Sequence, residues 1–202
     1  EIIEEKSKTI DNSTNINNNI KSIKGNYLVS GANFSKVYGK FDGYDNISMK
    51  VGFNLGYLTI KNNLISGSSW SRTGWKEASN NDGLKYSGTI TLDYFTGYTL
   101  FSLSNEKLLN SPLLGLQISY LMASEMCASL SYLGESNSDC TSESTFEDYD
   151  IGLLAGMLIP FSTEKDKETI NLFANVYLGL TEPIDNVSAK NLNFSVLLTY
   201  KL

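Results

Sequence analysis

The chain has 202 residues, 41% of them apolar, with 12 Tyr, 9 Phe and 16 Gly but only 3 Pro. This length suits one well-buried domain, and the composition favours β-structure. A net charge of −6 argues against nucleic-acid binding, which needs a basic surface, and the lack of His excludes Ser-His and Asp-His catalysis.

Residues 1–24 are rich in Asn, Ile, Lys and Glu and show no β alternation. Ile16, Ile20 and Ile23 lie at helical spacing, which fits a short amphipathic helix, and a disordered tether fits the composition equally well. We therefore expect a flexible or partly helical periplasmic segment over 1–24 and one barrel domain over 25–202. Because the chain starts at Glu1 without a signal sequence, we expect either a mature chain after signal cleavage or an expressed fragment.

From residue 25 onward, apolar and polar residues alternate with the period of a β-strand, and turn residues separate the alternating segments. The segment 48–58 shows the pattern well, with large apolar side chains on one face and Lys50 and Asn54 on the other. In the segment 113–124 the polar face carries Gln117, and in 168–181 it carries Asn175. The alternation predicts eight strands, at about 25–35, 48–58, 64–76, 86–102, 113–124, 148–161, 168–181 and 194–202.

The last predicted strand, 194–202, also alternates. Its polar face carries Ser195, Thr199 and Lys201, and Leu197 interrupts that face. We expect its apolar face to contact lipid through five residues: Phe194, Val196, Leu198, Tyr200 and Leu202.

Short to medium polar turns at 61–63, 105–107 and 163–167 alternate with mostly longer segments at 36–47, 77–85, 125–147 and 182–190. Short turns at one end and long loops at the other are typical of outer-membrane barrels. The sequence therefore predicts an all-β, eight-stranded antiparallel up-and-down transmembrane β-barrel in the bacterial outer membrane, with both termini periplasmic. A soluble lipocalin-type barrel would also alternate, but with its apolar side chains inward.

Candidate lumen residues are those on the polar faces. Arg72 and Asp93 are further candidates, and charges inside a small barrel either neutralise one another or form a proton or ion path. The main lumen candidates are Lys50, Asn54, Gln117, Asn175 and Lys201.

Cys127 and Cys140 are the only cysteines, and in an exported protein we expect them to form a disulfide; two unrelated thiols are the alternative. Without His they make a poor metal-ligand set, so no metal, cofactor or catalytic site is predicted. The acidic residues between 135 and 150 fit a solvated loop, and divalent-cation binding among lipopolysaccharide headgroups or partner docking is the alternative.

Several motifs, in the same order, resemble the small outer-membrane barrel family of the PorT type found in Bacteroidota. They occur at residues 29–35 (VSGANFS), 50–57 (KVGFNLGY), 92–95 (LDYF), 148–156 (DYDIGLLAG), 177–181 (YLGLT) and 198–202 (LTYKL). The chain departs from that family at Gly67 and at residues 96–98, where the family often carries Glu. The resemblance implies location and shape more than task, and PorT itself is associated with a secretion apparatus.

We therefore expect a non-enzymatic accessory or structural subunit of a larger outer-membrane complex serving secretion, assembly or uptake. The alternative is a narrow conduit or a loop-based receptor for a small or hydrophobic ligand, and a soluble ligand-binding barrel comes third. The expected partners are outer-membrane lipid, lipopolysaccharide and other outer-membrane proteins, with no nucleic acid.

Overall fold

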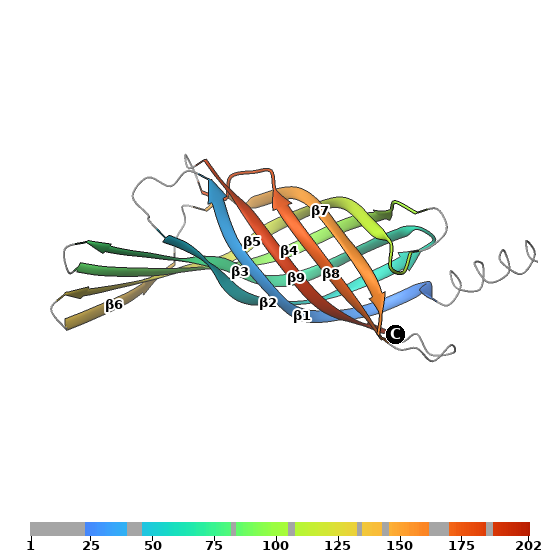
Figure 1. Ribbon diagram of the computed structural model, residues 1–202, viewed down its shortest axis with the longest axis horizontal. Coiled ribbons are helices and arrows are strands. Elements are labelled where there is room, and N and C mark those ends of the chain that lie inside the picture. Colours follow the sequence, from blue (N-terminus) through green and yellow to red (C-terminus); the bar gives the residue numbers. More distant parts are fainter. Residues whose placement is uncertain are drawn as a thin grey trace, which may run out of the picture.

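The computed structural model describes residues 23–39, 46–81, 84–104, 108–132, 135–142, 146–161, 170–184 and 188–202. These residues form nine β-strands in one sheet, and all neighbouring strands run antiparallel. The strands, drawn in Figure 1, are β1 Gly25–Gly39, β2 Asn46–Lys61, β3 Leu64–Asn81, β4 Leu84–Ser102, β5 Pro112–Tyr132, β6 Glu135–Thr141, β7 Tyr149–Pro160, β8 Ile170–Gly179 and β9 Ala189–Lys201.

Eight of these strands close into a ring. β1 pairs with both β2 and β9, while β4 pairs with β5 and β5 with β7, so the sheet has no open edge around the barrel. The remaining strand, β6, pairs with β5 and lies outside the ring. The prediction of an eight-stranded antiparallel up-and-down barrel is confirmed.

Both described chain ends lie at the same end of the barrel (Figure 1). There β1 begins, β9 ends, and the amide of Leu202 donates to the carbonyl of Asn26 over 2.8 Å. The two-residue connection between β2 and β3 lies at this end as well. Barrels of this kind are more elaborate at their extracellular end, and here the extended β3–β4 and β5–β6 hairpins lie at the opposite end, so both termini are periplasmic.

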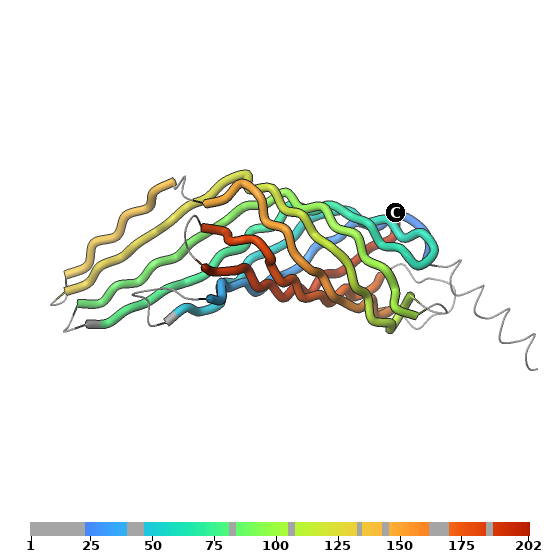
Figure 2. Tube along the Cα trace, turned by 90° about the horizontal axis from the view of Figure 1, so that it is seen from above, coloured from blue at the N-terminus to red at the C-terminus, as the bar shows by residue number. Residues whose placement is uncertain are grey.

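At the opposite end, β3, β4, β5 and β6 continue well beyond the rest of the barrel (Figures 1 and 2). β7 begins at Tyr149, opposite Tyr120, whereas β5 continues for twelve further residues to Tyr132. We call this four-stranded extension, residues 76–81, 84–91, 124–132 and 135–141, the platform. The predicted loops 77–85 and 125–147 are therefore wrong in large part, because most of their described residues are strand.

The barrel strands turn their large apolar side chains outward. Phe95, Leu116 and Tyr200, for example, are 53%, 57% and 55% exposed on β4, β5 and β9. This arrangement is the reverse of a lipocalin-type barrel and suits lipid around the wall. The outward belt includes Leu28, Leu55, Tyr57, Phe95, Phe101, Leu114, Leu116, Ile118, Ile151, Leu153, Ile170, Val176, Leu178, Phe194, Leu198 and Tyr200.

A closed antiparallel barrel with such a belt crosses a membrane with its strands, and even-stranded barrels of this kind belong to bacterial outer membranes. The chain is an outer-membrane β-barrel. In the part of the chain that the structure describes, no helix combines the length and apolar character needed to cross a membrane.

Candidate functional site

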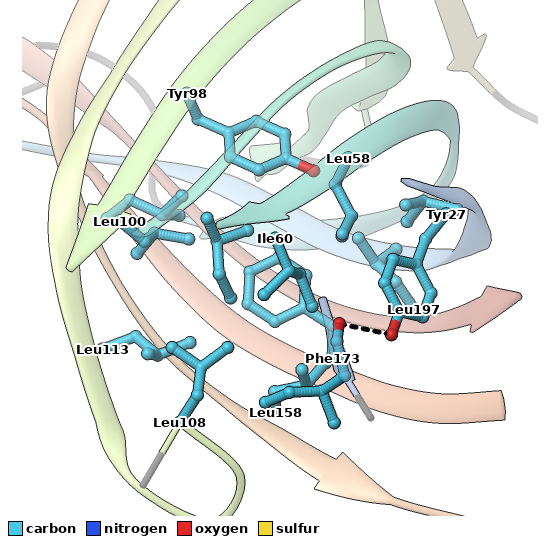
Figure 3. Packing of buried hydrophobic residues seen from close by; sticks show 14 of the residues in the cluster. Tyr27, Leu58, Ile60, Tyr98, Leu100, Leu108, Leu113, Leu158, Phe173 and Leu197 are labelled. Atoms are coloured by element: carbon cyan, nitrogen blue, oxygen red, sulfur yellow. Dashed lines mark hydrogen bonds between the residues drawn. The ribbon is translucent and has the colours of Figure 1, made fainter. Parts of the chain in front are cut away.

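The periplasmic end of the lumen is filled by an apolar cluster, the lower plug, shown in Figure 3. Ile23, just ahead of β1, is 2% exposed, and its carbonyl accepts a 2.7 Å hydrogen bond from the Tyr27 hydroxyl. The residue just before β1 therefore closes part of the periplasmic mouth of the barrel before the chain enters the wall. The other members include Leu58, Ile60, Ile65, Tyr98, Leu100, Leu108, Leu113, Leu158, Phe173 and Leu197.

Hydrogen bonds join strands across the polar middle of the lumen. The Asn33 amide donates to Asn54 Oδ1 and to the carbonyl of Arg72, both over 3.1 Å, and Asn54 donates to Ser195 Oγ over 3.3 Å. Gly52 leaves room for the contact between Asn33 and the Arg72 carbonyl, because a Cβ at Gly52 would lie 1.8 Å from that oxygen. These bonds connect β1, β2, β3 and β9.

Two small cavities remain in this middle layer, of about 30 and 20 Å³. Each has room for one or two water molecules, and neither is large enough for a solute. Ser71, Gln117, Tyr177 and Asn193 line both of them. The layer is therefore a polar filling with room for a few water molecules.

A second apolar cluster, the upper plug, fills the extracellular end of the lumen. Trp75 is 1% exposed and meets the Phe146 ring edge-on, with 6.0 Å between ring centroids. Val37, Ile90, Leu92, Tyr94 and Ala189 complete its buried part. With both plugs in place, apolar side chains close the lumen at each end.

Beside the upper plug lies a buried carboxylate, Asp150 on β7, which is 3% exposed. Thr181 Oγ1 donates to it over 2.8 Å and Asn191 Nδ2 over 2.7 Å. Thr181 lies just after β8 and Asn191 lies on β9, so Asp150 links β7, β9 and the segment that follows β8. The sequence placed Asp150 in the strand predicted at 148–161 but grouped it with the acidic residues of a solvated loop; in the structure it is buried on β7, paired with Ser119.

Four of the five predicted lumen residues lie on the inner face. Asn54 and Asn175 are buried and line the larger cavity, and Gln117 beside them donates to Ser119 Oγ over 3.2 Å. Lys201 follows the inward-facing Thr199 on β9, and its side chain lies near Gly25 at the periplasmic mouth.

Lys50 does not lie in the lumen, which corrects the sequence-based assignment. Its Nζ donates to the Ile90 carbonyl over 3.2 Å and to the Thr91 hydroxyl, which lies on the outer face of β4. The cause is a register shift between Met49 and Phe53, where an extra residue on β2 interrupts the alternation.

Arg72 and Asp93 also lie on the outer face. Arg72 Nε and Nη2 donate to the two carboxylate oxygens of Asp93 over 2.8 and 2.7 Å, in the only ion pair among the described residues. Their strands are paired at this point, so the bidentate contact lies along the outer wall.

Of the five predicted lipid-facing residues on or just after β9, four are exposed on the outer wall and Val196 is half-buried. The exposed four are Phe194, Leu198, Tyr200 and Leu202.

An outer aromatic row runs across the wall just below the platform. Trp70 on β3 is paired with Phe95, Phe95 with Tyr120, and Tyr120 with Tyr149. Phe53 meets Trp70 edge-on with 4.8 Å between ring centroids. Aromatic residues gather where lipid chains give way to headgroups, so this row marks the outer boundary of the hydrocarbon layer.

The platform is held together by strand pairing and by a disulfide between Cys127 on β5 and Cys140 on β6. The two cysteines are directly opposite each other in the register. Glu125 lies within 4.8 Å of both sulfur atoms. Because the sulfurs are bonded to each other, they offer no thiolate to a metal ion.

One face of the platform continues the inner face of the barrel and overlooks its mouth. On this mouth-facing side, Leu84, Leu130 and Tyr132 are 44%, 49% and 55% exposed. Glu135, paired with Tyr132, and Asp139 lie on the same face on β6. The platform thus presents apolar side chains beside carboxylates on a sheet that stands clear of the membrane.

Sequence reasoning missed the platform because its strands are rich in Ser, Asn and charged residues, β6 most of all. β6 reads Glu-Ser-Asn-Ser-Asp-Cys-Thr, and all seven of its residues are exposed. One signal pointed to it: two cysteines thirteen residues apart fit a hairpin closed by a cross-strand bridge.

No family model and no curated protein matches the chain. Among solved structures it is similar to Neisserial surface protein A (NspA), with a TM-score of 0.53 and 14% identity over 88% of this chain and 97% of that one. It is also similar to Ail, the attachment invasion locus protein of Yersinia pestis, with a TM-score of 0.50 and 18% identity over 89% of this chain and all of that one. At these identities the likeness establishes the shared fold.

Proposed function

We propose that the protein is a non-enzymatic outer-membrane anchor whose platform binds a larger outer-membrane assembly at the cell surface, as an accessory subunit of that assembly. The observation that carries the proposal is that the barrel is closed at both ends, while β3, β4, β5 and β6 project beyond it as one sheet, the platform. Because the lumen is closed, we expect binding to occur on the outer surfaces of the protein. The platform is the most extensive of these surfaces.

The partner surface follows from the chemistry of the mouth-facing side. Leu84, Leu130 and Tyr132 offer apolar contacts, and Glu135 and Asp139 favour a basic rim on the partner. The resemblance to the PorT type supports an accessory role in a secretion, assembly or uptake complex. A surface receptor for another ligand is the second candidate, favoured by the same exposed sheet; the name of Ail refers to attachment and invasion.

The plugs count against the other alternative, a conduit. A solute would have to displace Phe173 and its neighbours at one end and Trp75 at the other. Because both groups are well packed, such a path would require rearrangement of the barrel interior.

The test is mild-detergent extraction of the tagged protein from its native outer membrane, with mass spectrometry of what accompanies it. We compare the wild type with Leu130→Ser/Tyr132→Ser on the platform and with Leu28→Ser/Tyr200→Ser on the barrel wall as a matched control. We expect a stoichiometric set of outer-membrane proteins that only the platform variant loses. A lone monomer from wild-type membranes would overturn the accessory role.

A further inference from the structure

Three cationic side chains lie together on the outer wall, on the platform side of the outer aromatic row. Arg72 follows Trp70 by two residues on the outer face of β3, and Lys76 follows on the same face. Lys50 reaches this place from β2. We call Lys50, Arg72 and Lys76 the cation cluster.

The cluster is held in place by specific contacts. Arg72 is fixed by its bidentate pair with Asp93, and its Cζ lies 5.8 Å from the centroid of the Trp70 ring. Lys50 crosses β3 at Gly74, where the absence of a side chain leaves the Ile90 carbonyl open to its ammonium group. A Cβ at Gly74 would lie 1.9 Å from that same oxygen.

Two carboxylates share the surface, Asp93 and Glu125, so three positive charges face two negative ones. Asp93 is already neutralised by Arg72. Lys76 is exposed and forms no ion pair among the described residues. A local excess of positive charge thus remains in a chain whose net charge is −6.

Cations on a lipid-facing wall are costly in the hydrocarbon layer and become favourable where anionic headgroups begin. The aromatic row fixes that boundary, and the platform identifies the leaflet as the outer one, where lipopolysaccharide carries its phosphates on lipid A. We propose that the cation cluster is a binding site for the phosphate groups of lipid A. Lys50 and Lys76 supply charge, and Arg72, held over Trp70, supplies a planar donor edge.

This site lies on the outer face, away from the mouth-facing side of the platform that carries Leu84, Leu130 and Tyr132, and it is tested without a protein partner. The purified barrel in neutral detergent is titrated with bis-phosphorylated lipid A, and binding is followed by native mass spectrometry. Substitution of Lys50→Gln and Lys76→Gln together leaves the Arg72–Asp93 pair intact. Each lost charge should weaken binding about 5-fold, or about 30-fold for the pair.

Three comparisons separate this site from a general loss of charge or of fold. Lys61→Gln removes the same charge at the periplasmic end and should leave binding unchanged. Glu125→Gln should strengthen binding several-fold, a gain that damage to the barrel would not produce. Lipid A without phosphates should bind wild type weakly. Its affinity should be no higher than the affinity of bis-phosphorylated lipid A for the Lys50→Gln/Lys76→Gln variant.

A direct contact between ammonium groups and phosphates should also survive a chelator of divalent cations. Equal binding by wild type and the double variant would overturn the proposal, as would equal losses in the double variant and Lys61→Gln. Loss of wild-type binding in the chelator would likewise exclude direct contact. Heat-modifiable migration on gels verifies that each variant is folded.

Discussion

The Ser35 hydroxyl stabilises an irregular part of the barrel wall at Gly74. It donates to the carbonyl of Gly74 over 2.8 Å and accepts from the amide of the same residue over 2.9 Å. Gly74 has a φ of 133° and lies opposite the register shift in β2. The bulge disturbs the ladder there, and one buried hydroxyl satisfies both backbone groups.

We therefore expect Ser35→Ala to destabilise the barrel by about 1–3 kcal/mol, because two buried backbone groups lose their partner. Reversible denaturant unfolding in detergent measures this difference. Ser30→Ala, an outward position on the same strand, is the control and should have little effect. Equal stability of the two variants would contradict the role given to Ser35.

Glu77 gives the platform a pH dependence. It is 5% exposed, lies over Gly88, and accepts a 2.8 Å hydrogen bond from the Tyr86 hydroxyl. Burial raises its pKa above the ordinary value of 4.5, and the Tyr86 hydrogen bond only partly offsets this. Between 4.5 and the raised pKa, the folded state keeps a proton that the unfolded state has lost, so stability falls as pH rises through this window.

Replacement of Glu77 by Gln removes the charge but keeps an oxygen for Tyr86. We expect the β3–β4 hairpin of this variant to lose the pH dependence and to be more stable than wild type above the window. Hydrogen-exchange protection of the hairpin amides across pH measures both effects. Glu135→Gln, at an exposed position, should leave the wild-type profile unchanged; a wild-type profile in Glu77→Gln would contradict the assignment.

Lys50 shows where residue-level prediction from sequence stops. Strict alternation assigns it to the same face as Asn54, and Asn54 does lie in the lumen. The extra residue between Met49 and Phe53 reverses the pattern over a few positions. Nothing in the sequence marks that bulge, because the closest distortion, at Gly74, occurs on the neighbouring strand. The alternation of apolar and polar residues therefore could not predict that Lys50 joins the cation cluster.

At the scale of elements, the barrel strands could be predicted and the platform could not. A strand such as β8 separates lipid from a packed lumen, so its two faces differ in polarity and the alternation is strong. Both faces of β6 meet water, and its sequence is uniformly polar. The polar, serine-rich composition of β6 therefore indicates a loop. Pairing with β5 and the disulfide nevertheless make this segment a strand.

β6 has a single neighbour, β5, so the disulfide should carry much of its stability. A bridge closing a loop of this length contributes about 3 kcal/mol in the chain-entropy model, or roughly 100-fold in an opening equilibrium. In Cys127→Ser/Cys140→Ser we expect protection of the β6 amides from exchange to fall by up to that factor.

The barrel itself should be unaffected by loss of the bridge, since its ring closes without β6. Heat-modifiable migration of the serine variant should match wild type, and reduction of wild type should reproduce the exchange result. A barrel that unfolds at a lower temperature without the bridge would show that the platform and the ring are one cooperative unit.

At the scale of the whole molecule, the lumen is layered: apolar at the periplasmic end, polar in the middle and apolar again at the extracellular end. An eight-stranded barrel is just wide enough to be filled by its own side chains. Here the filling is unequal, since both ends are closed by tightly packed groups while the middle keeps room for water. The layering leaves the barrel filled by its own side chains along its length, beneath the platform.

A barrel closed in this way should not conduct ions. Purified protein inserted into planar lipid bilayers is expected to show no current steps above the bare-membrane leak, with a porin under the same conditions as the positive control. The two cavities of the middle layer measure only about 30 and 20 Å³, and buried apolar clusters lie on either side of them along the lumen, so we expect no continuous water path. Steady single-channel steps in wild type would contradict a closed lumen, whereas steps that appear only in Trp75→Ala or Phe173→Ala would show that these side chains close it.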